Sequence, residues 1–95
     1  MALAMNLNNF RKEIDNIDDE ILALFIKRMK AVKEIADFKK ANNLPVLNSG
    51  REDDIINRLC LNSDDNMKEY IKKLFSTIFD ISRIYQNDIL KSNKR

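Results

Sequence analysis

Apolar residues recur at every seventh position through the N-terminal part of this chain, and this repeat constrains the fold more than any other feature. Two rows of such residues run in parallel, offset by three positions. Rows spaced in this way form the seam of a helix that packs against other helices. The pattern predicts one helix from about residue 7 to about residue 41, with seam residues Leu7, Ile14, Ile21 and Ile35 in one row and Phe10, Ile17, Leu24, Ala31 and Phe38 in the other.

This helix is too long for a compact chain of 95 residues. It would span about 50 Å at 1.5 Å per residue, whereas a compact chain of this size has a radius of gyration of about 13 Å. Part of its apolar seam must therefore be covered by another surface. The simplest supplier is the same helix of a second chain, so we expect an intertwined homodimer.

Helical periodicity stops between Asn42 and Arg51, a stretch that contains the single proline and the single glycine of the chain. A short second helix is predicted to begin near Ser49, which forms an S-x-x-E capping box with Glu52, and to end near Leu61.

A polar turn at residues 62–66 precedes a third helix, predicted from about Met67 to about Lys91. Its expected seam residues are Ile71, Leu74, Ile78, Ile81 and Tyr85. The predicted fold is all-α, a single domain over residues 1–95 built as a long, a short and a long helix.

The composition argues against several classes of protein. One cysteine and no histidine supply neither a disulfide framework nor a common zinc site, and they remove the usual group for proton transfer near neutral pH. The 17 basic and 15 acidic residues are mixed along the chain, so nucleic acid is not an expected partner. The apolar stretch at the N-terminus is too short for a signal peptide or a membrane span, and one cysteine fits a reducing compartment. We expect a cytoplasmic protein that does not bind membranes.

Arg28 occupies a seam position that holds Ile21 one heptad earlier and Ile35 one heptad later. A charge in such a seam is unfavourable unless it is paired. Lys39 follows on the same helix face about 16 Å away, so both long side chains can converge on one small ligand. Two alternatives stay open, a snorkelling or ion-paired Arg28 and a solvated helix end at Lys39.

Arg11 lies about 100° around the helix from Arg28, so it does not easily serve the same site within one chain. In a crossed or antiparallel dimer it could reach the site of the partner. The alternative is a surface ion pair with Asp15.

Further polar groups stand near the predicted apolar faces of the second and third helices. Arg51 and Glu52 lie just before an apolar cluster, although Glu52 also has its alternative role in the capping box. Ser82 and Gln86 form an i, i+4 pair beside the third-helix seam. The combination of cations, a carboxylate, an amide and a hydroxyl suits a small dianion that carries a hydroxyl group.

Four blocks of the sequence are similar to those of a known family. They are R-K-E-I-D-N-I-D-D-E-I-L-A-L-F-I-K-R-M, I-A-D-F-K-K-A-N-N-L-P-V, R-E-D-D-I-I-N-R-L and S-R-I-Y-Q. Together they resemble the all-helical bacterial class of chorismate mutases over nearly the whole chain. The resemblance implies a helical homodimer that converts chorismate to prephenate, on the route to phenylalanine and tyrosine, with no cofactor and no metal.

The resemblance also implies a substrate site in each subunit. Arg28 and Ser82, together with Arg11 from the partner, would hold the carboxylates of chorismate. Arg51 would add positive field and orient its neighbours.

Around the reacting atoms, the resemblance implies that Glu52 accepts a hydrogen bond from the ring hydroxyl, while Lys39 and Gln86 donate to the ether oxygen as its bond breaks. Asn48 stands where the family often has an aspartate near the hydroxyl. Its amide oxygen can accept a hydrogen bond but brings no charge.

Two other functions are compatible with these residues. An isochorismate pyruvate lyase of the same fold would use a similar cationic site. A non-catalytic helical dimerisation module would use Arg28 and Glu52 as structural residues.

Overall fold

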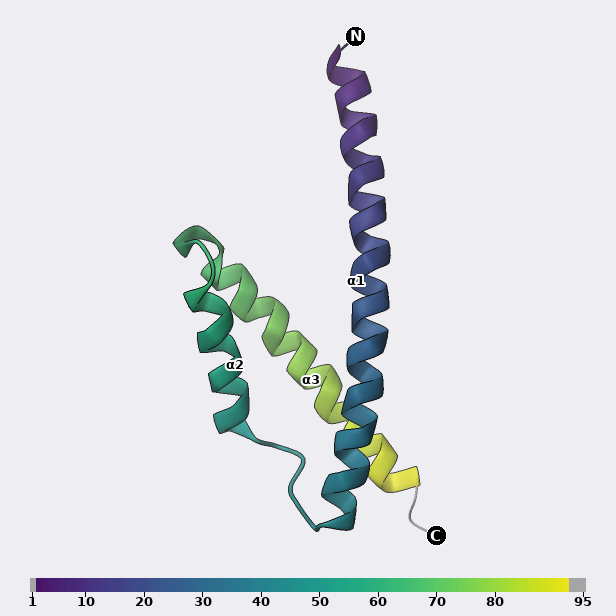
Figure 1. The fold of residues 1–95 in the computed structure, drawn as a ribbon, viewed down its shortest axis with the longest axis vertical. Coiled ribbons are helices and arrows are strands. Elements are labelled where there is room, and N and C mark those ends of the chain that lie inside the picture. Colours follow the sequence, from purple (N-terminus) through teal and green to yellow (C-terminus); the bar gives the residue numbers. More distant parts are fainter. Residues whose placement is uncertain (1, 93–95) are drawn as a thin grey trace. The chain divides into compact units, whose positions relative to one another are not determined.

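The computed structural model describes the backbone of residues 2–92 and the side chains of residues 6–91. The described residues form α1 (Ala2–Ala41), α2 (Ser49–Leu61), the short 3₁₀ helix η1 (Asp65–Met67) and α3 (Lys68–Ser92) (Figure 1). The predicted all-α fold with a long, a short and a long helix is therefore confirmed. The predicted bounds of α2 agree with the structure, and α3 begins one residue later than predicted because Met67 belongs to the 3₁₀ turn.

The chain divides into two units, residues 1–31 and residues 32–95, and the boundary lies within α1. In the first unit α1 begins at Ala2, five residues before the predicted start. The prediction began the helix at the first residue of the heptad pattern. The alanine, leucine and methionine at residues 2–5 are strong helix formers and extend the helix without belonging to that pattern.

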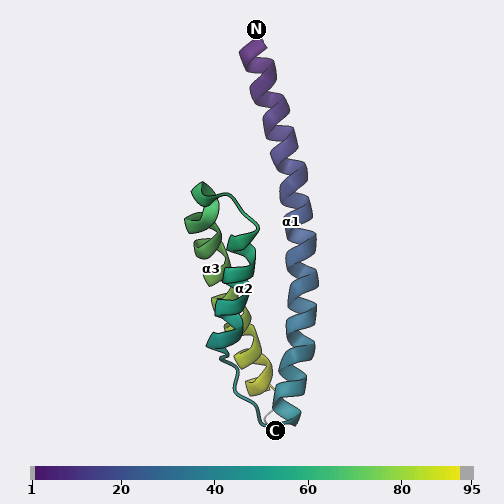
Figure 2. The ribbon, with the colours of Figure 1, turned by 60° about the vertical axis from the view of Figure 1, so that its left-hand side comes forward.

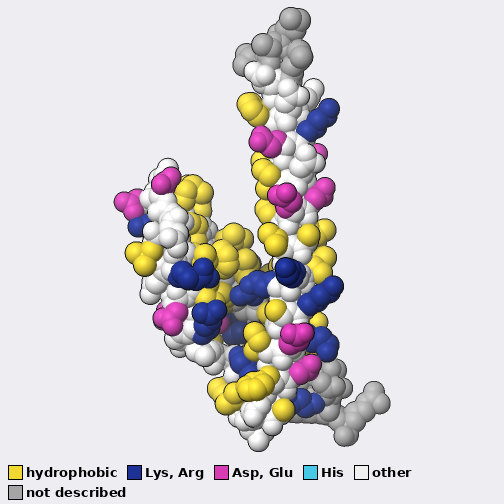
Figure 3. Space-filling view, viewed as in Figure 1, with side chains coloured by type: hydrophobic (Ala, Val, Ile, Leu, Met, Phe, Trp, Pro, Cys, Tyr) yellow, Lys and Arg dark blue, Asp and Glu magenta, His cyan; other side chains and the backbone are white. Residues whose placement is uncertain are grey.

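The seam residues of the first unit are exposed in the single chain. Phe10 is 61% exposed, Ile21 58% and Leu24 65%, and Leu7, Ile14 and Ile17 are also exposed. Figure 3 shows hydrophobic side chains following α1 along the face in view. A row of this kind is normally buried against another surface.

In the second unit α1 ends in a Schellman motif, which turns the chain back beside the end of the helix. Asn43 adopts the left-handed conformation with φ 55°. The Leu44 N–H donates to the Lys39 carbonyl (2.8 Å) and the Asn43 N–H to the Lys40 carbonyl (3.4 Å), which is the pairing that defines this motif. Glycine is the usual residue at this position, but the glycine of this chain, Gly50, lies in the first turn of α2 instead.

Replacing Asn43 with alanine should destabilise the chain by about 1 kcal/mol, since a β-carbon disfavours the left-handed conformation and alanine lacks the local hydrogen bonding of asparagine. Asn43→Gly should be at least as stable as the parent. Urea denaturation of each variant at one protein concentration measures the difference. Asn57→Ala, an exposed change within α2, is the control, and equal midpoints for Asn43→Ala and Asn57→Ala would contradict this reading of the turn.

The cap of α2 differs from the predicted capping box. Asn48, not Ser49, is the N-cap, and its side-chain oxygen accepts from the Arg51 N–H at 3.0 Å. Ser49 is the first helical residue. Both residue types are good N-caps, so the local pattern left two registers that differ by one residue. The role of Glu52 as the second member of the box is consequently wrong.

α2 packs against α3, and Figures 1 and 2 both show the two helices side by side. On α2 the half-buried apolar residues Ile55, Ile56 and Leu59 follow the spacing of one helix face. On α3, Phe79 is 4% exposed, and its ring lies 6.1 Å from that of Phe75 in a tilted pair, a favoured aromatic arrangement.

The predicted seam of α3 is only partly buried in the single chain. Ile71, Ile78 and Tyr85 are half-buried as expected, but Leu74 is 57% and Ile81 37% exposed. α3 is apolar on more than one side, so periodicity alone did not identify the face that packs within the chain. Polar Ser82 and Gln86 belong to that inward face, since they are 6% and 7% exposed.

Candidate functional site

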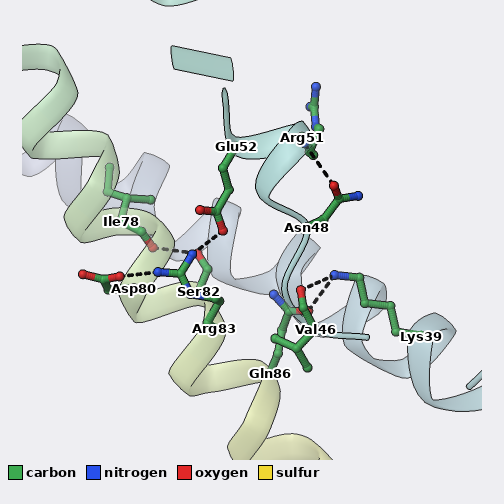
Figure 4. A network of polar contacts seen from close by, with 10 residues as sticks. All are labelled: Lys39, Val46, Asn48, Arg51, Glu52, Ile78, Asp80, Ser82, Arg83 and Gln86. Carbon is green, nitrogen blue, oxygen red and sulfur yellow. Dashed lines mark hydrogen bonds and ion pairs between the residues drawn. The ribbon is translucent and has the colours of Figure 1, made fainter. Parts of the chain in front are cut away.

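Lys39 links three segments of the second unit at the end of α1. Its Nζ donates to the Val46 carbonyl oxygen at 2.8 Å and to Gln86 Oε1 of α3 at 3.3 Å (Figure 4). The Schellman turn makes the first contact possible, because it returns the loop that carries Val46 to the last turn of α1. Lys39 is half-buried and is therefore not the solvated helix end that the sequence left as an alternative.

These contacts orient two donors. A lysine ammonium has three N–H groups, and the two bonds of Lys39 leave one directed elsewhere. Gln86 uses its amide oxygen to accept from Lys39, so its NH₂ group is the part that can donate to a ligand. The pair thus holds two groups that can still donate, one on each side chain.

Glu52 reaches across from α2 to α3. Its Oε2 accepts from Arg83 Nη1, while Arg83 Nη2 donates to Asp80 one turn earlier on α3 (Figure 4). The side chains of Glu52 and Arg83 are 25% and 27% exposed. The hydrogen bond to Glu52, more than any other contact, raises the pKa of the Arg83 guanidinium above its usual value, so this cation stays charged at any working pH.

Ser82 lies between the two groups of contacts on the inward face of α3. Its hydroxyl donates to the Ile78 carbonyl of its own helix at 2.8 Å, a local bond that serine often makes within helices. Donation to a substrate carboxylate would require the hydroxyl to rotate away from Ile78.

Asn48 and Arg51 are exposed at the start of α2. The Asn48 side-chain oxygen is occupied by its capping bond. Figure 4 shows the Arg51 side chain directed away from Lys39 and Gln86. The structure thus brings Lys39 and Gln86 into contact and places Glu52 against Arg83, but it does not bring the Arg51 side chain to Lys39 and Gln86.

The sequence comparisons identify the family. Residues 10–87 match the family described as "Chorismate mutase type II". The chain belongs to this family. The match contains Lys39, Gln86 and the whole of α2, so it covers the polar contacts described above.

Individual relatives are of two kinds. The chain is 38% identical over 87 residues to the bifunctional chorismate mutase/prephenate dehydratase of Buchnera aphidicola subsp. Schizaphis graminum. The aligned region covers 90% of this chain and 23% of that protein. The chain is also 30% identical over 92 residues to the chorismate mutase of Methanocaldococcus jannaschii, and here the aligned region covers 93% of this chain and 91% of that protein. The chain thus spans about a quarter of the length of the bifunctional relative and nearly all of the other. No solved structure gives a significant match.

Arg11 and Arg28, the two cations expected to bind carboxylates, lie on α1 in the first unit. Arg28 is half-buried and Arg11 is exposed. Their contribution to the site stays a prediction from the family resemblance.

Sequence reasoning missed two members of these contacts, Arg83 and the Val46 carbonyl. Arg83 is part of the S-R-I-Y-Q block, and its spacing from Asp80 signals an i, i+3 ion pair. Its contact with Glu52 on another helix has no local signal. Every residue has a backbone carbonyl, so the sequence cannot show that the one of Val46 accepts a hydrogen bond.

The part of the chain that the structure describes shows neither a membrane-spanning helix nor a cluster of metal ligands. No helix there combines the length and apolarity of a membrane span. Among the same residues, no group of three or more histidine, cysteine, aspartate or glutamate side chains is placed to hold a metal ion.

Proposed function

We propose that this chain converts chorismate to prephenate by an intramolecular rearrangement. The observation that carries the proposal is the contact of Lys39 with Gln86 and the Val46 carbonyl in a member of the chorismate mutase type II family. A pericyclic rearrangement needs no nucleophile, general base or metal. What a protein can contribute is confinement of the flexible substrate to its reactive shape and fixed donors where negative charge develops.

Lys39 and Gln86 supply those donors. As the bond between the ether oxygen and the ring breaks, that oxygen gains negative charge. The remaining N–H of Lys39 and the NH₂ of Gln86 would donate to it. Since the two side chains already hold each other, they need little reorganisation during the reaction, and a donor that is favoured by growing charge raises kcat.

The remaining residues bind the substrate. Arg28, and Arg11 from a partner chain, would pair with the carboxylates, with Ser82 beside them. Glu52 would accept from the ring hydroxyl through the carboxylate oxygen that Arg83 does not use.

Two residues at the start of α2 are exposed. Arg51 would contribute positive field from an exposed position, and Asn48 would meet the hydroxyl only by leaving its role as N-cap.

We further propose that the functional form is a homodimer in which each chain donates Arg11 to the other. The exposed seam of residues 7–24 supports this, because several large apolar side chains in regular heptads are left on the surface of a single chain. One domain over residues 1–95 and a cytoplasmic location remain predictions from composition.

A direct assay tests the activity. The purified chain mixed with chorismate alone should deplete the ultraviolet absorbance of chorismate and yield prephenate, identified by NMR. Lys72→Met, which removes an exposed lysine that pairs with Glu69 on α3, is the control and should react like the parent chain.

The alternative functions give other outcomes. Release of pyruvate from isochorismate, with no prephenate from chorismate, would identify the lyase. A dimerisation module would show no turnover and no rise in Tm with either compound, because only a chain that binds a ligand in its native state is stabilised by it.

A further inference from the structure

Arg83 connects α2 and α3, two helices that carry substrate-contacting residues in the proposed mechanism. Its Nη1 pairs with Glu52 on α2 and its Nη2 with Asp80 on α3. Asp80 is itself 66% exposed, whereas Arg83 and Glu52 are each about a quarter exposed. The Glu52 contact is therefore the more sheltered of the two, and Asp80 fixes the guanidinium from the solvent side.

Arg83 lies on α3 close to two residues of the proposed substrate site. Arg83 directly follows Ser82 and precedes Gln86 by three residues, and both neighbours are buried. Figure 4 shows Glu52 extending from α2 toward Arg83 and Ser82. The ion pair thus holds the Glu52 carboxylate against the part of α3 that carries the proposed substrate contacts.

A glutamate side chain is flexible, and a guanidinium restricts it strongly. The arginine guanidinium is planar and rigid, and with its Nη2 paired to Asp80 its Nη1 restricts where the Glu52 oxygen that it contacts can lie. A carboxylate positioned before binding loses less conformational freedom when it accepts a hydrogen bond from a ligand.

We propose that Arg83 is a positioning residue for the reaction and acts through Glu52, by holding this carboxylate where it accepts from the ring hydroxyl of the substrate. The inference rests on the proposed mutase function. It differs from a purely structural role, in which the ion pair would join α2 to α3 with no specific effect on the substrate hydroxyl.

A double-mutant cycle separates these roles. Arg83→Met removes the fork and keeps an unbranched apolar side chain, and it should lower kcat/KM about 10-fold, the effect expected for strongly coupled contacting residues. In a Glu52→Gln background the same change should lower kcat/KM by less than about 2-fold, because the carboxylate through which Arg83 acts is gone. Arg83→Lys should recover part of the activity, since an ammonium can pair with Glu52 but lacks the fork.

The cycle has a second readout and a matched control. The dissociation constant of prephenate, which retains the ring hydroxyl, is measured for the same four chains and should show the same dependence on Glu52, even where turnover is too slow to follow. Lys72→Met breaks the exposed Lys72–Glu69 pair of the same helix and should change neither quantity.

The outcomes distinguish this inference from the function on which it rests. If the parent chain forms no prephenate, both the proposed mutase function and the positioning role of Arg83 are overturned. If the parent chain is active and Arg83→Met lowers kcat/KM by the same factor in the parent and in the Glu52→Gln background, the positioning role alone is overturned. Such a result would assign the ion pair to helix packing, with a fall in Tm as its main effect.

Discussion

Replacement of Gln86 or of Lys39 by alanine is expected to lower kcat about 100- to 1,000-fold with little change in KM, the size of effect seen when one donor to a developing oxyanion is removed. The reason lies in the contact between the two side chains. Because Lys39 donates to the Gln86 oxygen, each residue both supplies a donor and orients the other. Neither donor gains its full value until charge builds on the ether oxygen.

Arg11→Ala should behave differently and mainly raise KM, by about 10- to 100-fold, since a carboxylate carries the same charge in substrate and transition state. Steady-state kinetics of the three variants at one pH make the comparison. Gln86 is 7% exposed, so Gln86→Met is added as a control that keeps the volume and removes the donor. If all variants show the same fall in kcat and the same rise in KM, this division of roles is contradicted.

The parts of the fold that local chemistry determines were predictable from the sequence. α2 was predicted from Ser49 to Leu61 and is found there, because its limits depend on nearby caps and on a short amphipathic pattern. The end of α1 was also predicted near Ala41, although its turn is made by Asn43 and not by the glycine that lies later in the chain.

The structure differs from the sequence prediction where two solutions are locally equivalent. Asn48 and Ser49 are both capable N-caps, and the structure uses Asn48. On α3 the heptad rule selected Leu74 and Ile81, which are exposed in the single chain, because that rule does not identify which apolar face packs against α2.

The candidate site shows the same limit. Lys39 and Gln86 were selected by residue type, helix position and family resemblance, and the structure adds that they contact each other. Arg83 was overlooked because its importance depends on Glu52, which is 31 residues away on another helix. Long-range pairing of this kind is a property of the packed helices and has no signature in either segment alone.

A mixture of two defective variants should recover activity if the site is shared between subunits. At a chorismate concentration below the KM of the parent chain, Arg11→Ala chains and Arg28→Ala chains are each expected to have little activity alone. In a hybrid dimer one site contains both substitutions, while the other combines Arg28 of the first variant with Arg11 of the second. Random exchange makes about half of the dimers hybrid, so the mixture should reach about a quarter of the parent activity.

A second pair of variants makes this prediction specific. Arg28 and Gln86 are proposed to serve a site from the same subunit, so a mixture of Arg28→Ala with Gln86→Ala chains produces hybrids in which both sites are defective, and no activity should return. Mixing Arg11→Ala with Gln86→Ala should again recover about a quarter, because one hybrid site is intact. Mass spectrometry of differently tagged chains establishes that exchange has occurred. Recovery in all three mixtures or in none of them, with exchange demonstrated, would exclude the donation of Arg11 across the dimer, and sedimentation of the parent as a single chain would exclude the dimer itself.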